Sequence, residues 1–472
     1  MSKANVLEWS IEELSKSIKN KEVSPVEVTQ ATLDLIDKDE TNSFITVMEE
    51  DALQNAKQAE MDILKGNYKG PLHGISIGIK DLIHIAGYKT TFGSETHKDF
   101  VPEIDAEVIR KLKESGAIIV GKLNMHNFAY GTTGDRSYYG PVRNPHNFQK
   151  IAGASSSGSG AAVASYQCFG SVGSDTGGSV RMPASMCGIV GMKPTFGRVS
   201  KNGSLPLCWT LDHLGPMTRN VIDNALMLNV LSGFDSKDPY SINAIKEDFT
   251  EGIDADIRGK KIGIPTNFYF DILDPTVEKI FNICVDNLRH LGAEIIPIEI
   301  PGMDDLLIAQ QIITVAESFA SMEKHLIKHP EMIEEEVRSR VIPGLNIQAS
   351  EYINMLQVRN KTIDLHNQLF EKIDVIMTPT LATLPTDIEQ RDVEINGSKE
   401  HVRMFAKLTG PSNTTGAPAI SVPGGTSESG LPVGIQFIGN HLDESGLYQI
   451  AYALEQTGVY QSELSLPSNM KI

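Results

Sequence analysis

The apolar and polar positions of the chain change pattern near residue 71. Before it the pattern is helical: Ser10 with Glu13 resembles a capping box, Ser24 followed by Pro25 is a typical helix start, and residues 51–64 continue in helical spacing. From Pro71 onward, apolar residues alternate with others through Ile79, which is the period of a strand, and this strand ends at Lys80. We therefore expect a buried strand with lysine at its end.

The rest of the chain repeats a strand–helix rhythm. A helix is expected over residues 106–115, and a second opens at Asp274-Pro275. Strands are expected at 117–122, 260–264, 294–300, 375–380 and 419–423, and a last strand (LPVGIQFIG) precedes a helix over 445–455. Residues 302–370 are polar, charged and helix-prone, and we expect them to form a variable cap. This order predicts an α/β fold, with helices on the faces of a largely buried sheet, in a single domain over residues 1–472.

Residues 153–197 differ from the rest of the chain in composition. They hold ten glycines, and eight serines lie between Ser155 and Ser179. A flexible linker has a similar composition, but the apolar runs AAVA and CGIVGM argue against one. The loop GASSSGSG lacks the lysine of a phosphate-binding loop, and it does not match the GxSxG pattern of a nucleophile elbow.

Composition and charge narrow the class of protein. The chain has 472 residues, 40% hydrophobic content and a net charge of -18, which disfavours binding to nucleic acid or to an anionic membrane surface. No stretch resembles a secretory signal or a membrane-spanning helix. The cysteines have no metal-ligand spacing and are expected to be reduced, buried thiols of a cytoplasmic protein (Cys168, Cys187, Cys208, Cys284).

The segment GSDTGGSVR at residues 173–181 is the first candidate for catalysis. Its adjacent glycines let several backbone N–H groups converge on one point, where they can stabilise an oxyanion, and Ser179 follows directly as a candidate nucleophile. The base can be His213, oriented by Asp212, or Lys80. Neighbouring residues on a strand point to opposite faces, which disfavours the histidine pair. A lysine at the end of an apolar strand is desolvated, and this lowers its pKa.

The motifs GISIGIKD, GASSSGSGAAVA and GSDTGGSVRMPASMCGIVGMKPTFGRVS, in this order, resemble the amidase signature family. The resemblance continues through Arg143–Pro145, Leu211–Arg219, Asp374–Thr380 and Leu431–Gly439, so it covers almost the whole chain, and residues 71–220 correspond to the signature core. It implies an α/β/α sandwich around a twisted mixed sheet. It also implies a triad of Ser179 as nucleophile, Ser155 as bridging serine after a cis peptide, and Lys80 as base. The N–H groups of four residues would form the oxyanion hole: Thr176, Gly177, Gly178 and Ser179.

The sequence departs from the family pattern at Ala154 and Ser157, where glycines are usual, and at Asn127, where glutamate is usual. We expect these changes to leave the triad intact. The resemblance places Ala129, Tyr130, Gly131, Thr132 and Thr133 along the substrate pocket. Arg359 is a weaker candidate for binding a substrate carboxylate, because a solvated helix face is the better account of it. Three aromatic residues could border the pocket or simply pack elsewhere: Tyr138, Tyr139 and Trp209.

Two functions are compatible with these motifs. The first is a stand-alone hydrolase of small amides, with carbamate esters such as urethane as a related substrate class, since the same oxyanion hole serves both carbonyls. The second is the glutaminase subunit of a tRNA-dependent amidotransferase, which would pass ammonia to a partner. The stretch SLPLCWTLDHLGPMTR is more similar to the stand-alone enzymes. No metal or organic cofactor is expected, and a homodimer is left open.

Overall fold

The structure is a computed structural model that describes residues 6–462 and residue 464. The ends of the domain predicted over 1–472, namely residues 1–5, 463 and 465–472, lie outside the described residues.

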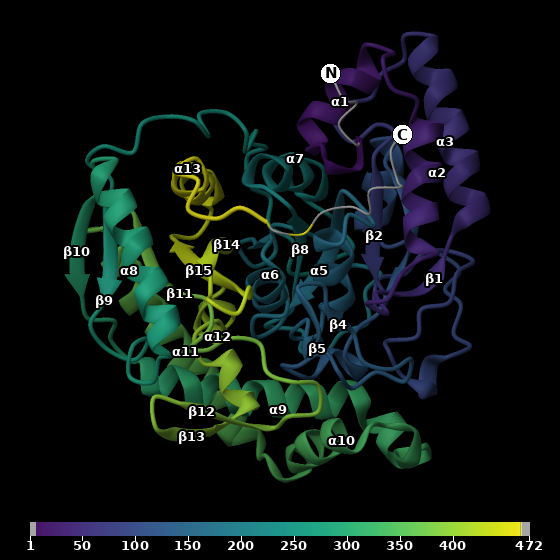
Figure 1. The fold of residues 1–472 in the computed structure, drawn as a ribbon. Coiled ribbons are helices and arrows are strands. Elements are labelled where there is room, and N and C mark those ends of the chain that lie inside the picture. The colour runs from purple at the N-terminus through teal and green to yellow at the C-terminus, as the bar shows by residue number, and fades with distance from the viewer. Residues whose placement is uncertain (1–5, 463, 465–472) are drawn as a thin grey trace.

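The centre of the molecule is a mixed sheet of 11 strands, twisted across the view of Figure 1. Its strands, in spatial order, are β1 (Phe44–Val47), β3 (Ile118–Leu123), β2 (Ser76–Lys80), β6 (Gly170–Asp175), β8 (His213–Thr218), β7 (Val190–Lys193), β14 (Ala419–Thr426), β15 (Pro432–Gly439), β11 (Val375–Pro379), β9 (Lys261–Pro265) and β10 (Glu294–Ile298). Strands β3, β2 and β6 are parallel, as are β11, β9 and β10, whereas the strands between these two groups pair antiparallel. Two short hairpins lie outside the sheet: β4 (Arg143–Asn144) with β5 (Asn147–Ile151), and β12 (Asp392–Ile395) with β13 (Ser398–His401).

Helices cover both faces of this sheet. On β15, a Cβ added at Gly434 would meet Ser185 of α6 (Arg181–Cys187), whereas one added at Gly439 would meet Leu447 of α13 (Glu444–Glu455). The two glycines are an odd number of residues apart, so they face opposite sides of the strand. The fold is therefore the α/β/α sandwich around a mixed sheet that the sequence predicts. The other helices that flank the strands are α1 (Ile11–Lys19), α2 (Pro25–Ile36), α3 (Glu49–Leu64), α4 (Glu107–Glu114), α5 (Ser157–Ala164), α7 (Val221–Leu231) and α8 (Pro275–His290).

The predicted helix starts are confirmed in detail. Ser10 and Glu13 form the capping box of α1, with each side chain bonded to the backbone of the other residue. The Ser24 hydroxyl accepts from the N–H groups of Val26 and Glu27, and Pro25 is the first residue of α2. These bonds satisfy N–H groups that have no partner inside the helix.

Residues 302–370 are helical in the structure. They form α9 (Met303–Lys328), α10 (Glu335–Val341) and α11 (Ala349–Leu369), joined by the short turns η4 (Pro330–Met332) and η5 (Ile342–Asn346). In Figure 1 these helices lie together at the bottom of the molecule, beside the β12–β13 hairpin. The turn η6 (Val402–Ala406) and α12 (Gly410–Thr415) follow the hairpin and lead back to the sheet through β14. These elements position one side of the candidate site.

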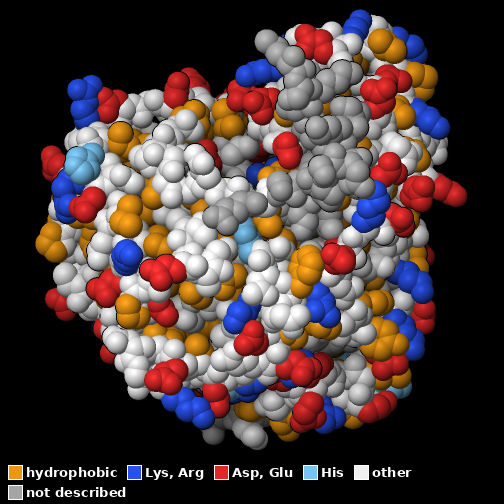
Figure 2. Space-filling view, viewed as in Figure 1, with side chains coloured by type: hydrophobic (Ala, Val, Ile, Leu, Met, Phe, Trp, Pro, Cys, Tyr) orange, Lys and Arg blue, Asp and Glu red, His pale blue; other side chains and the backbone are white. Residues whose placement is uncertain are grey.

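Three further observations bear on the class of protein. Acidic and basic side chains are interspersed over the face shown in Figure 2. Among the described residues, no helix is both long and apolar enough to cross a membrane. The four cysteines are free and buried, as the sequence predicts.

Candidate active site

Lys80 is the most buried member of the candidate site. Strand β2 is buried along its whole length, and β2 and β6 run parallel, so the end of β2 lies beside the end of β6. The Lys80 side chain is 0% exposed, and its Nζ donates to three hydroxyl groups: Ser155 Oγ at 2.7 Å, Ser156 Oγ at 2.8 Å and Ser174 Oγ at 2.8 Å. Burial lowers the pKa of Lys80 well below its usual value, and the carboxylates of Asp175 and Asp212 oppose this shift. Lys80 therefore becomes neutral at a lower pH than an exposed lysine does.

Ser155 lies in a tight turn before α5. Gly153 and Ala154 both have positive φ, at 96° and 47°, and the Ala154 N–H donates to the carbonyl of Thr132 at 2.9 Å. Among the described residues no peptide bond is cis, so the cis bond expected before Ser155 does not occur. Two consecutive left-handed residues make the turn instead, and they tie it to the loop that holds Thr132.

Ser157, one of the departures from the family pattern, is accommodated by a neighbouring glycine. A Cβ added at Gly134 would lie 2.5 Å from the Ser157 Cβ, so only glycine leaves room at that position. Asn127, the third departure, is buried, and its Nδ2 donates to the carbonyl of Gly93 at 2.9 Å.

Ser179 faces Ser155 from the loop after β6. The N–H of Ser155 donates to Ser179 Oγ at 3.3 Å, which places the third predicted triad member against the residue that contacts Lys80. No hydrogen bond within the described residues uses the N–H groups of Thr176, Gly177 and Ser179, which leaves these donors for a ligand oxygen. The prediction differs at Gly178: its N–H donates to Asp175 Oδ1 at 2.7 Å, because the positive φ of Gly178 (124°) turns it toward that carboxylate.

A buried ion pair fixes the loop that carries Ser179. Asp175 and Arg181 are both 0% exposed, and the guanidinium contacts the carboxylate through Nη2 at 2.9 Å and Nε at 3.0 Å. Burial opposes ionisation of Asp175, but the charge and hydrogen bonds of Arg181 hold the pKa of this carboxyl below its usual value. The remaining Arg181 bonds reach across the sequence to the Thr409 carbonyl, Ser412, Asn413 and Gln436.

A cavity of about 600 Å³ opens at Ser179. Four of the five residues predicted to lie along the substrate pocket line it, namely Ala129, Tyr130, Gly131 and Thr132, whereas Thr133 does not. The opposite side is formed by residues of α9, α10, η5 and η6 and their surroundings, among them Gln310, Gln311, Thr314, Ser339, Arg340, Arg403 and Lys407. Three of these side chains are cationic, and none of the described residues that line the cavity is acidic.

Arg340 is the cation most closely tied to the substrate loop. Its Nη1 donates to the Tyr130 carbonyl at 3.0 Å, and its guanidinium lies 4.1 Å from the centre of the Tyr130 ring. Burial lowers the pKa of Arg340, and the nearby positive charge of Arg403 adds to this effect. An anion bound between them would relieve that repulsion. Sequence reasoning missed Arg340, since a charged residue in a seven-residue helix gives no signal that separates a cavity wall from a solvated face.

Several other candidates lie away from the cavity. Arg359 is placed over the ring of Phe196, with 5.9 Å to its centre, rather than in the cavity. Tyr138, Tyr139 and Trp209 do not line the cavity either, and Tyr138 and Trp209 are exposed.

The His213–Asp212 alternative also fails to assemble on Ser179. His213 Nε2 lies 3.2 Å from Lys193 Nζ, and Asp212 instead accepts from the Thr176 hydroxyl.

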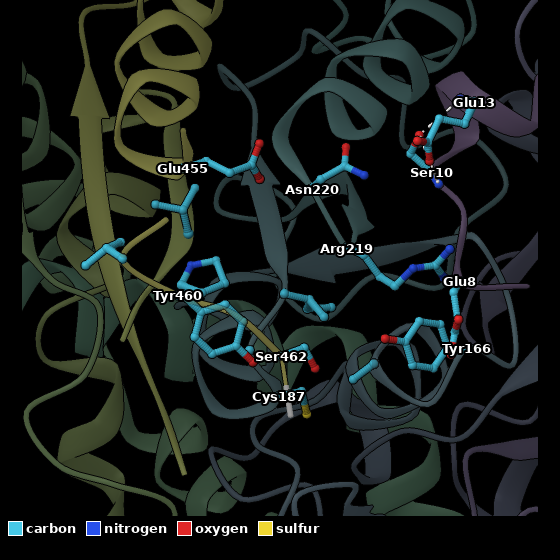
Figure 3. A pocket seen from close by; sticks show the side chains of 16 residues that line it. Glu8, Ser10, Glu13, Tyr166, Cys187, Arg219, Asn220, Glu455, Tyr460 and Ser462 are labelled. Carbon is cyan, nitrogen blue, oxygen red and sulfur yellow. Dashed lines mark hydrogen bonds between the residues drawn. The ribbon is translucent and has the colours of Figure 1, made fainter. Parts of the chain in front are cut away.

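A second cavity, of about 350 Å³, lies between the N-terminus of α7 and the last described residues of the chain (Figure 3). Glu8, Tyr166, Arg219 and Glu455 are among the residues that line it. Its thiol, Cys187, is held in the protonated form, because burial raises the pKa of this group. Cys187 is therefore not an activated nucleophile. Among the described residues, no group of three His, Cys, Asp or Glu side chains could hold a metal ion.

A mixed sheet with a buried lysine, a serine bonded to it, a second serine beside the first and a cluster of free backbone N–H groups is an arrangement compatible with a hydrolase. A model of the amidase family matches residues 27–448, and the chain belongs to this family, the amidase signature hydrolases.

Individual relatives span different activities. The chain is 36% identical to a glutamyl-tRNA(Gln) amidotransferase subunit of Geobacter metallireducens, over 97% of this chain and 99% of that one. Among solved structures, it is 30% identical, with a TM-score of 0.93, to the protein reported as "An unexpected vestigial protein complex reveals the evolutionary origins of an s-triazine catabolic enzyme", covering 97% of this chain and 100% of that one. A bacterial aryl acylamidase is 27% identical, with a TM-score of 0.89 and 96% of each chain covered.

Proposed function

We propose that the protein hydrolyses the C–N bond of small amides that carry a carboxylate, through an acyl-enzyme, without needing a partner subunit. The observation that carries the proposal is the cavity at Ser179, where three cations and no acidic side chain among the described lining residues face the nucleophile. A carboxylate on the substrate would be bound by Arg340 and Arg403, with Lys407 further along the wall.

The proposed reaction relays protons through Ser155 to Lys80. Neutral Lys80 accepts a proton from the Ser155 hydroxyl, which is bonded to its Nζ. That hydroxyl accepts the proton of Ser179, whose Oγ is bonded to the Ser155 N–H, as Ser179 Oγ attacks the amide carbonyl. The N–H groups of Thr176, Gly177 and Ser179 stabilise the oxyanion. The proton returns along the same chain to the leaving nitrogen, and water then hydrolyses the acyl-enzyme. The same steps release an alcohol from a carbamate ester, so urethane-type substrates remain part of the proposal.

The second candidate function is a glutaminase subunit, which the similarity to amidotransferase subunits favours. Glutamine carries an α-ammonium group beside its α-carboxylate. An ammonium group in the cavity would meet three cations and no carboxylate among the described lining residues, so only neutral groups such as Gln310 and Thr314 could accept its hydrogen bonds. The charge of the cavity therefore supports an anionic substrate without an amine over glutamine.

The test is ammonia release by the purified chain alone. The substrates are succinamic acid, the neutral amide butyramide, glutamine and ethyl carbamate, with Ser179→Ala as the blank. We expect the carboxylated amide to have a higher kcat/KM than butyramide, and Arg340→Met to lower its kcat/KM by about 10- to 100-fold while sparing butyramide.

The matched control is Arg338→Met, since Arg338 lies on the same helix but pairs with Glu335 and does not line the cavity. Preference for butyramide over succinamic acid would contradict the proposed substrate class. Turnover of glutamine only after a partner subunit is added would favour the amidotransferase.

A further inference from the structure

The hydrogen bonds of Lys80 leave a choice of which hydroxyl exchanges its proton with the amine. A protonated Nζ can donate to Ser155, Ser156 and Ser174 together, whereas a neutral Nζ has only two protons and must accept from one of these groups. Ser156 cannot supply that proton, because its hydroxyl donates to the Ser174 carbonyl at 3.0 Å. Ser155 and Ser174 are the two hydroxyls that can.

These two hydroxyls face different surroundings. Ser155 lies against Ser179, which lines the substrate cavity. Ser174 lines a separate cavity of about 10 Å³, together with Thr176, Lys201 and Asp212. A space of this size holds about one water molecule when polar groups surround it, as they do here. Lys80 therefore has a second polar neighbourhood, which the proposed catalytic steps do not use.

Asp212 is the acidic group of this second neighbourhood, and three donors hold it in place. It accepts from the Thr176 hydroxyl at 2.6 Å and from the N–H groups of Leu207 and Cys208 at 2.9 Å each. Its carboxylate thus connects the loop that precedes Ser179 with Leu207, which lines the substrate cavity. Burial raises the pKa of Asp212, and the positive charge of Lys201 opposes that shift.

The other charged groups around Lys80 and Asp212 have partners of their own. Asp175, whose carboxylate acts on Lys80 more strongly than that of Asp212, is paired with Arg181. Two other carboxylates lie near this region. Asp238 and Glu317 both act on Lys201, and Glu317 also acts on Cys208. Asp212 is thus a charge near Lys80 that can be removed without breaking the Asp175–Arg181 pair.

We infer that Asp212 is a positioning residue that stabilises the protonated form of Lys80 from the Ser174 side, and so raises the lowest pH at which Lys80 acts as a base. The inference rests on the proposed Lys80–Ser155–Ser179 chemistry, but it does not depend on the substrate class. Asp212 is not expected to touch the substrate, because it does not line the substrate cavity.

The experiment measures phosphonylation of Ser179 by a small alkyl fluorophosphonate, from about pH 5 to about pH 10. In this reaction the Ser179 oxygen bonds to phosphorus, fluoride leaves, and the serine proton passes through Ser155 to Lys80. The rate constant, followed by the mass of the labelled protein, should rise with pH to a plateau. In Asp212→Asn we expect the midpoint of that rise to move down by about half a pH unit or more, with the plateau retained within a few-fold.

Two variants serve as controls. Asp212→Glu keeps the charge and should keep the wild-type midpoint. Asp238→Asn removes a buried carboxylate that bonds the N–H of Lys201 but does not line the small cavity, and it should leave the midpoint unchanged. If Asp212→Asn does not fold, Asp212→Ser is measured in the same way.

An unchanged midpoint in the neutral variant would overturn the inference. A lower plateau with no shift of the midpoint would do so as well, since it would show only a structural role. Phosphonylation needs no amide substrate, so the proposed substrate class can fail while this result stands.

Discussion

The two sides of the substrate cavity are built in different ways. On the side formed by the signature core (residues 71–220), the polar groups are buried and have fixed partners, as in the contacts of Lys80, Ser155 and Asp175. On the side formed by α9, α10 and η6, the polar groups belong to long side chains, and Arg403 is exposed. The core side is suited to one reaction, whereas the helical side can change its charge without disturbing the sheet. In the proposed function, chemistry and substrate selection would thus be separated in space.

The strongest test of this comparison is on the core side. Ser179→Ala removes the proposed nucleophile and should lower ammonia release from every substrate by at least about 1,000-fold. The measurement is the initial rate with saturating substrate, with circular dichroism as the check on folding. Ser157→Gly, which changes a neighbouring serine that contacts Gly134 rather than Lys80, should keep most of the activity. Residual turnover above a few per cent in Ser179→Ala would mean that another residue attacks the carbonyl.

The second test concerns Lys80. Lys80→Ala should lower kcat/KM by about 100- to 10,000-fold for neutral and anionic substrates alike. In the wild-type protein kcat/KM should rise with pH, because the neutral amine is the active form, and it should level off well below the usual lysine pKa, because burial favours the neutral form. The variant should lose this rise. A pH profile that is the same in both proteins would assign the base to another group.

A smaller effect is expected on the helical side. Lys407→Met should raise KM for a carboxylated amide by a factor of about 3 to 10 and leave the neutral amide unaffected. The effect is smaller than for Arg340 because Lys407 is partly exposed and has Asp271 at 3.7 Å. Equal changes for both substrates would mean that the two sides of the cavity are not separated in function.

The smallest effect is expected in the second cavity, remote from both sides. Burial raises the pKa of Glu455 to about 7, against the hydrogen bond that its carboxylate accepts from the Val221 N–H. A carboxyl with a raised folded-state pKa stabilises the fold at low pH and loses this contribution as the pH rises through about 7.

Relative to wild type, the free energy of unfolding of the Glu455→Gln variant should therefore increase by roughly 2 kcal/mol as the pH is raised from about 5 to about 8. Catalysis should be unchanged. The measurement is the free energy of unfolding by denaturant at each pH. Asp223, whose pKa burial raises to about 6, remains in both proteins, and its charge adds to the raised pKa of Glu455 in the wild type. A stability difference that does not vary with pH would contradict the assignment.

The signature core could be predicted from the sequence because its constraints are local. Strand period, helix caps and small residues placed Lys80, Ser155 and Ser179 correctly in relation to the elements that carry them. The resemblance to a family supplied what periodicity alone could not, namely which serine faces the lysine.

The helical side could not be predicted, because its signal is not local. Arg359 and Arg340 both lie on charged helices, and only the packing of α10 against the Tyr130 loop makes Arg340 part of the cavity. The orientation of the Gly178 N–H was missed for a similar reason, since it depends on the position of the Asp175 carboxylate. Long-range contacts of this kind become visible only in three dimensions.

The contacts of Arg181 also determine how much of the chain must be synthesised before the loop that carries Ser179 can fold. The guanidinium is bonded to Asp175 and to partners as late in the chain as Gln436. A nascent chain that has emerged only as far as residue 400 holds every residue of the proposed triad, yet it leaves this buried cation without most of its acceptors. The chain must therefore be synthesised at least as far as Gln436 before the loop that carries Ser179 acquires all its contacts.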